Sequence, residues 1–239
     1  MLGMIGGTGF YFLKGKEKRE RIETPFGEAV VQRTKIFKKD VVFIPRHGET
    51  HAIPPHKINY KANLWALKEL GVTAVFGIYA TGILSRRYRP GDLILIDDFI
   101  GLFTPITFFD DFSDGMKHID FSRPYDKKLK GILLARAKTN HIRLKDGGIV
   151  ATTVGPRFET RAEIRALSML GANLVSMTHG YEATLVGELE IPFAALAIGT
   201  NYACGIAKHR LSWEEVVRVL EEQKGKVITL VDELIKEVE

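Results

Sequence analysis

The apolar residues of this chain recur with two different periods, and this alternation restricts the possible folds more than any other feature. Some segments are apolar at every second position and others at about every 3.6 positions, a mixture typical of α/β proteins. Two strand-like segments, Val75–Ala80 and Phe193–Ile198, are apolar on both faces. Strands of this kind lie inside a sheet that is covered on both sides. We therefore predict an α/β fold with a mixed central β-sheet flanked by helices.

The predicted strands are short, rich in apolar or β-branched residues, and bounded by glycine, proline or charged residues. They are Leu2–Ile5, Ala29–Phe37, Val41–Pro45, Ala74–Tyr79, Leu93–Phe99, Gly148–Thr153, Asn173–Met177 and Pro192–Gly199. The predicted helices carry apolar residues at helical spacing, and two of them stop at a glycine. They are Ile58–Leu70, Asp126–Thr139, Glu159–Leu170 and a last helix that begins near Trp213. Between them, Gly101–Asp120 is expected to be a long surface loop.

The 239 residues suit one compact domain, and no linker, repeat or biased tract divides them. We therefore predict a single domain over residues 1–239. No apolar run approaches the ~20 residues of a membrane-spanning helix, and the N-terminal segment lacks the pattern of a signal peptide. The single cysteine, Cys204, excludes an internal disulfide framework and a cysteine-rich zinc site. These observations predict a cytoplasmic protein without a membrane partner.

The chain carries 34 Lys and Arg against 29 Asp and Glu, a formal net charge of +5. A basic surplus fits a nucleic-acid partner, an anionic small ligand or an ordinary solvated surface. The densest basic cluster, Lys14–Arg21, alternates in sign and lacks the interleaved aromatic residues of a single-strand binding surface. We therefore expect no nucleic-acid partner and interpret this cluster as solvated surface.

Glycines and polar side chains follow several of the predicted strands. Gly6–Gly9 follows the first strand, where it can turn backbone N–H groups toward an anion or form only a tight turn. Arg46 and His47 follow the third, and an arginine there can bind two phosphate oxygens or lie on the surface. Met177–Thr178 and Thr200–Asn201 close two later strands. Four such strand ends at one sheet edge indicate a ligand site.

Two further patterns allow both a structural and a functional interpretation. Glu159 lies where a turn opens a helix, so its carboxylate either faces the helix dipole or accepts from a ligand N–H. His47, His51 and His56 have a spacing that resembles zinc sites, but the glutamate of H-E-x-x-H is absent and Pro54–Pro55 interrupts any helix. We therefore predict no bound metal.

Taken in order, these motifs resemble the trimeric family of purine nucleoside and methylthioadenosine phosphorylases. The matching segments are Ile5–Gly9, Thr24–Gly27, Arg46–Gly48, His51 with Ile53, Lys57–Tyr60, Ala62–Asn63, Trp65–Glu69, Pro90–Asp92, Gly155–Glu163 and Met177–Thr178. This family catalyses reversible phosphorolysis, in which a nucleoside and phosphate give a purine base and a ribose 1-phosphate. The resemblance implies inorganic phosphate as co-substrate, no cofactor, and a homotrimer or homohexamer.

The resemblance also implies the phosphate contacts, which are Thr8, Arg46, His47, Tyr79, Ala80 and Thr178. Relatives usually carry Thr or Asn where Tyr79 stands, so in this chain the backbone at Tyr79 and Ala80 would contact the phosphate. A second departure is His179–Glu182, which replaces the family's Val-Pro before a glutamate. An anion beside the sugar stabilises an oxocarbenium-like transition state, so no nucleophilic side chain is required.

Two positions predict the base. Relatives that cleave 6-oxopurine nucleosides carry asparagine where Asn201 stands, whereas those that cleave 6-aminopurine nucleosides carry aspartate. The 6-oxopurine enzymes also carry a glutamate that accepts from N1–H, here Glu159 beside Phe158. The Asn201 amide would donate toward N7 as the bond breaks, which makes it the implied catalytic residue. The remaining implied purine and ribose contacts are Met177, Tyr202 and Ala203.

Two further positions predict which chemical group the sugar carries at its 5′ position. Trp213 stands where nucleoside-cleaving relatives have a histidine for the 5′-hydroxyl and methylthio-specific relatives have an apolar residue. His118, in the long loop, matches a position that reaches into a neighbouring subunit's site. These positions favour 5′-methylthioinosine, with inosine and guanosine as further substrates. A 5′-methylthioadenosine phosphorylase and a nucleoside-binding protein without turnover remain as alternatives.

Overall fold

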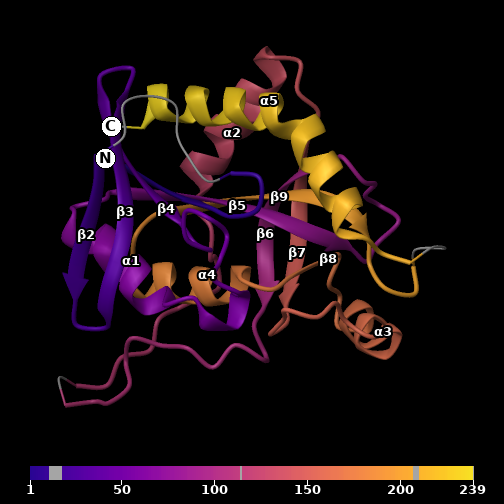
Figure 1. Cartoon of the computed structure of the whole chain (residues 1–239), viewed down its shortest axis with the longest axis horizontal. Coiled ribbons are helices and arrows are strands. Elements are labelled where there is room, and N and C mark those ends of the chain that lie inside the picture. Colours follow the sequence, from indigo (N-terminus) through magenta and orange to yellow (C-terminus); the bar gives the residue numbers. More distant parts are fainter. Residues whose placement is uncertain (11–17, 114, 207–209, 239) are drawn as a thin grey trace.

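The computed structural model describes residues 1–10, 18–113, 115–206 and 210–238, and over these residues it forms a nine-stranded mixed sheet (Figure 1). The strands are β1 (Leu2–Gly6), β2 (Lys18–Thr24), β3 (Gly27–Ile36), β4 (Lys39–Pro45), β5 (Ala74–Ile83), β6 (Leu93–Ile100), β7 (Leu144–Thr152), β8 (Leu174–Ser176) and β9 (Phe193–Tyr202). The helices are α1 (Tyr60–Glu69), α2 (Lys127–Thr139), α3 (Arg161–Met169), α4 (His179–Glu188) and α5 (Trp213–Glu237), with a 3-10 turn at Pro55–Lys57. The predicted α/β fold with a mixed, helix-flanked sheet is confirmed.

The strand order is β2-β3-β4-β1-β5-β8-β7-β6-β9, and β5 also pairs with β9. Strands β5, β8, β7, β6 and β9 therefore close into a ring of paired strands. The neighbours β4, β1, β5 and β9 run parallel to one another. Because the carboxyl ends of parallel strands meet at one edge of a sheet, the residues that follow these four strands are brought together.

Helices cover both faces of the sheet (Figure 1). On one face, α5 and α2 pack on the sheet, and the α5 residues Leu220, Val227 and Leu230 join Phe43 and Phe76 in a fully buried layer. On the other face, α1 packs against β2 and β3, α4 packs against β7 and β9, and both helices join the second apolar layer. The two apolar layers explain why β5 and β9 are apolar on both sides.

Two elements were not predicted. β2 carries charged residues at most positions and lies at the sheet edge, paired with β3 alone, so its sequence gives no apolar signal. Its exposed Lys18 and Arg19 agree with the solvated surface predicted for Lys14–Arg21, of which residues 14–17 lie outside the described part. α4 is buried on most sides, so it lacks the polar face that marks a surface helix.

The described residues of Gly101–Asp120 contain neither helix nor strand, as predicted for a surface loop. Within the described part of the chain, none of the helices combines the length and the apolar character that crossing a bilayer requires.

Candidate active site

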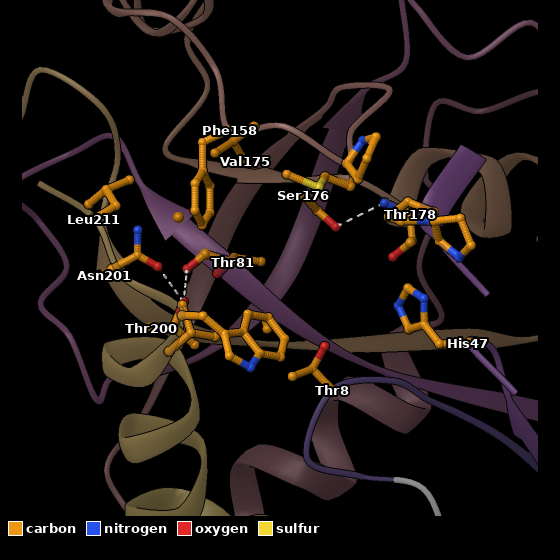
Figure 2. A pocket seen from close by; sticks show the side chains of 18 of the residues that line it. Thr8, His47, Thr81, Phe158, Val175, Ser176, Thr178, Thr200, Asn201 and Leu211 are labelled. Carbon is orange, nitrogen blue, oxygen red and sulfur yellow. Dashed lines mark hydrogen bonds between the residues drawn. The ribbon is translucent and has the colours of Figure 1, made fainter. Parts of the chain in front are cut away.

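A cavity of about 560 Å³ opens at the sheet edge where β1, β4, β5 and β9 end (Figure 2). Its volume falls in the range of roughly 300–1,000 Å³ that is usual for small-molecule sites. β8 runs antiparallel to β5, with Val175 opposite Gly82, and thereby carries Ser176 and Thr178 to the same edge. The cavity therefore combines segments that are far apart in the sequence.

One end of the cavity is lined by five of the residues predicted to bind phosphate, namely Thr8, Arg46, His47, Ala80 and Thr178. The glycine loop lies directly against the arginine, since a Cβ at Gly7 would come within 2.5 Å of Arg46 Nη1. Only glycine allows this approach. Thr178 is the N-cap residue of α4, so the positive end of that helix dipole also faces this region.

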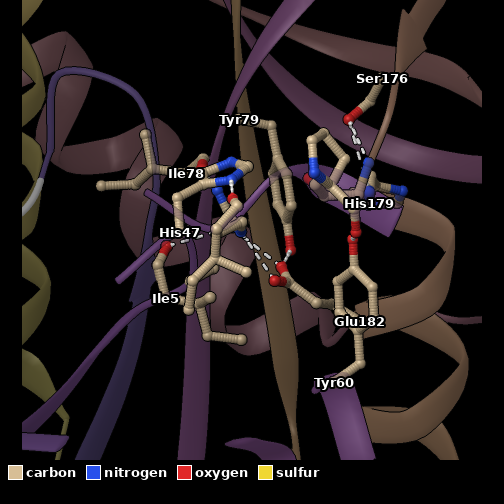
Figure 3. Close-up of polar contacts among 12 residues, drawn as sticks. Ile5, His47, Tyr60, Ile78, Tyr79, Ser176, His179 and Glu182 are labelled. Atoms are coloured by element: carbon tan, nitrogen blue, oxygen red, sulfur yellow. Dashed lines mark hydrogen bonds and ion pairs between the residues drawn. The ribbon is translucent and has the colours of Figure 1, made fainter. Parts of the chain in front are cut away.

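The Tyr79 side chain does not line the cavity, so a phosphate contact at this position stays a prediction for the backbone. On β5 the lining residues are Ala80, Thr81 and Gly82, which directly follow Tyr79. The Tyr79 hydroxyl instead donates to Glu182 Oε2 over 2.6 Å (Figure 3). Burial, together with the Glu182 carboxylate, raises the pKa of Tyr79 well above its ordinary value, which keeps the hydroxyl a donor.

Glu182 belongs to a buried ion pair that the sequence analysis missed. Its carboxylate accepts from Arg46 Nε over 2.7 Å and from Arg46 Nη2 over 2.9 Å, and both side chains are almost fully buried. A planar guanidinium bound in this bidentate way is fixed in orientation. The sequence signal was an acidic residue in the first turn of the mostly buried α4, whose other glutamate, Glu188, stands at the last position.

At the other end of the cavity, Glu159 faces inward instead of capping a helix. The N-cap of α3 is Thr160, and it forms a capping box with Glu163. Glu159 precedes this cap, is buried, and accepts from the Thr153 hydroxyl over 2.7 Å through Oε1. Among the described residues no donor is bonded to its Oε2, so this oxygen can accept from a ligand. Phe158, whose side chain is partly exposed, also lines the cavity here.

Asn201 reaches the cavity because of an irregularity in β9. The β5–β9 pairing shifts between Thr81 and Gly82, whose partners are Gly199 and Asn201, so Thr200 is an extra residue in a β-bulge. Consecutive residues of a regular strand point to opposite faces, yet Thr200 and Asn201 both line the cavity. The bulge thus brings two adjacent polar side chains to one side.

Hydrogen bonds fix the orientation of the Asn201 amide. The Thr200 hydroxyl donates to Asn201 Oδ1 over 2.7 Å, and Asn201 Nδ2 donates to the Tyr202 carbonyl over 3.1 Å. A carbonyl oxygen can only accept, so the NH2 group must lie on the Tyr202 side. One N–H of this amide remains for a ligand. The Tyr202 side chain does not line the cavity, whereas Ala203 does.

Met177, the residue before Thr178 in the chain, also lines the cavity. A Cβ at Gly155 would come within 2.6 Å of the Met177 sulfur, so glycine is needed for the 155–159 loop to close over it. Figure 2 places Phe158, Leu211 and Asn201 at one end of the cavity and His47 and Thr178 at the other.

Trp213, at the start of α5, lines the cavity together with the apolar Leu211 and Val216. Its ring lies 5.8 Å from that of His51, measured between centroids, and His51 also lines the cavity. From the sequence, His51 matched the family pattern and was weighed as a metal ligand, but it was not assigned to the substrate site. His118 lies away from this cavity in its own chain, beside Phe112 in the long loop.

His179, the second departure from the family pattern, is fully buried next to the Glu182 pair. Its Nε2 lies 3.0 Å from the Tyr125 hydroxyl, and its Nδ1 has no hydrogen-bond partner among the described residues. Burial, with a smaller effect of the Arg46 charge, lowers the pKa of His179 to about 3. His179 is therefore a neutral core residue and does not line the cavity.

The described residues contain no group of three or more His, Cys, Asp or Glu side chains that could hold a metal ion. Although the rings of His47 and His51 lie 4.5 Å apart, the third histidine of the predicted pattern, His56, does not line the cavity with them.

The chain is similar to known proteins over nearly its whole length. Residues 2–236 match the model of the phosphorylase superfamily. The chain is 41% identical to the probable 6-oxopurine nucleoside phosphorylase of Moorella thermoacetica, covering 94% of this chain and 88% of that protein. It is also 41% identical to the probable S-methyl-5'-thioinosine phosphorylase of Methanopyrus kandleri, covering 98% and 91%. Methylthioadenosine phosphorylase from Schistosoma mansoni, solved with adenine, superposes with a TM-score of 0.89 at 28% identity, covering 98% and 90%.

Proposed function

Because this chain belongs to the phosphorylase superfamily, we propose that it cleaves the N-glycosidic bond of 6-oxopurine nucleosides with inorganic phosphate. The products are the free base and a ribose 1-phosphate or its 5-methylthio derivative. The single observation that carries the proposal is the fixed Asn201 amide, which presents an N–H to the cavity. A 6-oxopurine offers acceptors at N7 and O6, so a donor at this position suits it better than a 6-aminopurine.

In the proposed mechanism the base lies between Asn201 and Glu159. The free oxygen of Glu159 accepts from N1–H, a hydrogen that a 6-oxopurine carries and a 6-aminopurine lacks. As the glycosidic bond breaks, negative charge develops on the purine. Asn201 stabilises that charge by donating to N7, an interaction that strengthens in the transition state.

Phosphate binds at the opposite end of the cavity, at Thr8, Arg46, His47, Thr178 and the backbone near Ala80. The ribose lies between the two ends, against Met177. This arrangement holds the anion beside the sugar, where it stabilises the oxocarbenium-like transition state and then attacks it.

The 5′ group is proposed to be methylthio, because the side chains of Trp213, Leu211 and Val216 present a mainly apolar surface and offer no acceptor for a hydroxyl hydrogen. The names of the relatives include both substrate classes, so inosine and guanosine are proposed as further substrates. A 5′-methylthioadenosine phosphorylase is the second candidate, favoured by the similarity to the Schistosoma enzyme. A homotrimer or homohexamer, completed by His118 from a neighbouring subunit, and a cytoplasmic location remain predictions.

The test is release of free base from 5′-methylthioinosine, inosine, guanosine and 5′-methylthioadenosine, each with and without phosphate. We expect phosphate-dependent release of hypoxanthine, fastest from 5′-methylthioinosine. Equal release of base without phosphate would show that the protein is a hydrolase and not a phosphorylase. Faster release of adenine than of hypoxanthine would favour the second candidate, and binding without any product would favour a nucleoside-binding protein.

A further inference from the structure

The positive charge at the anion end of the cavity is already compensated within the protein. Arg46 is paired with Glu182, and the Tyr79 hydroxyl holds the same carboxylate from the other side (Figure 3). Arg46 Nη1 donates to the Ile78 carbonyl over 2.9 Å, and Nη2 reaches the Ile5 carbonyl over 3.5 Å. Of the five N–H groups of a guanidinium, these contacts leave one on Nη1, next to Gly7.

His47 presents an acceptor to the same end of the cavity. Its Nδ1 lies 2.9 Å from the Ile53 carbonyl, and because a carbonyl only accepts, the ring hydrogen must be on Nδ1. Burial, reinforced by the charge of Arg46, lowers the pKa of His47 to about 4, so the ring is neutral near pH 7. Nε2 therefore carries a lone pair, and no described residue donates to it.

Hydroxyl donors lie around this acceptor. Thr8 and Thr178 line the same end of the cavity as His47. An oxyanion placed there can accept from both hydroxyls and from the free N–H of Arg46. The oxygen that meets His47 Nε2 is different, because two lone pairs would face each other unless that oxygen carries a hydrogen.

Resting on the proposed function, we propose that this site selects an oxyanion that carries its own hydroxyl, with His47 Nε2 accepting that hydroxyl hydrogen. Near neutral pH, inorganic phosphate and arsenate keep at least one hydroxyl. Sulfate and monofluorophosphate have a similar size but no hydroxyl hydrogen. His47 is thus a specificity-determining residue for the anion. Because Glu182 already neutralises Arg46, the negative charge of an anion is not sufficient for selective binding.

Isothermal titration calorimetry of the full chain at pH 7.5 with phosphate, arsenate, sulfate and monofluorophosphate, at constant ionic strength, tests the proposal. We expect phosphate and arsenate to bind at least about tenfold more tightly than the two anions without a hydroxyl. Affinities for all four anions within about twofold of one another would overturn the proposal, and so would the absence of phosphate binding.

Two variants sharpen the test. His47→Gln offers an amide donor as well as an acceptor, so the preference for phosphate over sulfate should fall toward one. Thr178→Val removes a donor that every anion uses. It should therefore weaken the binding of all four anions and leave the preference for phosphate over sulfate unchanged. An unchanged preference in His47→Gln contradicts the proposal. These outcomes are separate from the proposed function, since nucleoside cleavage can depend on phosphate even where sulfate binds equally well.

Discussion

The Thr200 hydroxyl donates to Asn201 Oδ1 over 2.7 Å, although the two residues are adjacent in a strand. The bulge opposite Thr81 and Gly82 makes this contact possible, since it turns both side chains to the cavity. The contact holds the oxygen of the carboxamide away from the ligand. The choice of base in our account therefore depends on Thr200 as well as on the two residues that touch the purine, Asn201 and Glu159.

Thr200→Val should impair the reaction without altering the shape of the cavity. The valine removes the hydroxyl that holds Asn201 Oδ1, so the amide can turn its oxygen toward the purine. We expect kcat/KM for 5′-methylthioinosine to fall roughly tenfold, the effect of one lost hydrogen bond. Thr200→Ser keeps the hydroxyl and should restore most of the activity. Equal activity of the valine and serine variants would contradict this role.

Asn201→Asp should shift the preference from 6-oxopurines toward 6-aminopurines. A carboxylate can accept from a 6-amino group, whereas it repels the O6 atom of hypoxanthine. It would also face the Tyr202 carbonyl, to which the native amide donates. The ratio of kcat/KM for 5′-methylthioadenosine to that for 5′-methylthioinosine should rise at least about tenfold. An unchanged ratio would show that Asn201 does not determine which base is cleaved.

Glu159→Gln should lower kcat/KM for 6-oxopurine nucleosides by about tenfold to a hundredfold, because the carboxylate that accepts from N1–H is lost. Glu163→Gln is a matched control, since Glu163 lies four residues later and belongs to the capping box of α3. The control should lose about 1 kcal/mol of stability and keep its substrate preference. Equal kinetic effects of the two substitutions would contradict the assignment.

Trp213→His should favour nucleosides with a 5′-hydroxyl. The imidazole supplies a hydrogen-bond partner for that hydroxyl, and the apolar contact with a methylthio group is lost. Steady-state kinetics with inosine and 5′-methylthioinosine should show the ratio of their kcat/KM values rising about tenfold. If the ratio stays the same, Trp213 does not form the subsite for the 5′ group.

The buried His179 should make the protein less stable in mild acid. Its folded-state pKa of about 3 lies below the ordinary value of 6.5, so the native ring stays neutral while the unfolded ring takes up a proton. Stability should therefore fall as the pH drops below about 6.5, by about 2 kcal/mol between pH 7 and pH 5 from this residue. His179→Phe should lose that much less stability over the same interval in urea unfolding. Parallel pH profiles of the two proteins would contradict the assignment.

The parts of the fold that follow apolar periodicity were predictable from the sequence. The strands β1, β3, β4, β5, β6, β7, β8 and β9 and the helices α1, α2, α3 and α5 were expected within a few residues. β2 was missed because its pairing with β3 depends on backbone hydrogen bonds and on only one apolar residue, Ile22. α4 was missed because burial on most sides removes the amphipathic pattern.

The residues that line the cavity were predictable only in part. Strand ends indicated Arg46, His47 and Asn201, because parallel strands bring their carboxyl ends together. The orientation of Tyr79 could not be predicted, because its hydroxyl donates to Glu182 in α4, a helix that the sequence did not reveal. The contribution of Thr200 could not be predicted either, since it depends on a bulge that the sequence does not reveal.

The most direct test is a crystal structure of the protein with hypoxanthine and phosphate bound together. The account predicts that Asn201 Nδ2 donates to N7, that Glu159 accepts from N1–H, and that phosphate contacts Thr8 and Thr178. The gap between the base and the phosphate should accommodate a ribose lying against Met177. A structure in which Asn201 or Glu159 turns away from the base, or in which phosphate binds elsewhere, would contradict the account.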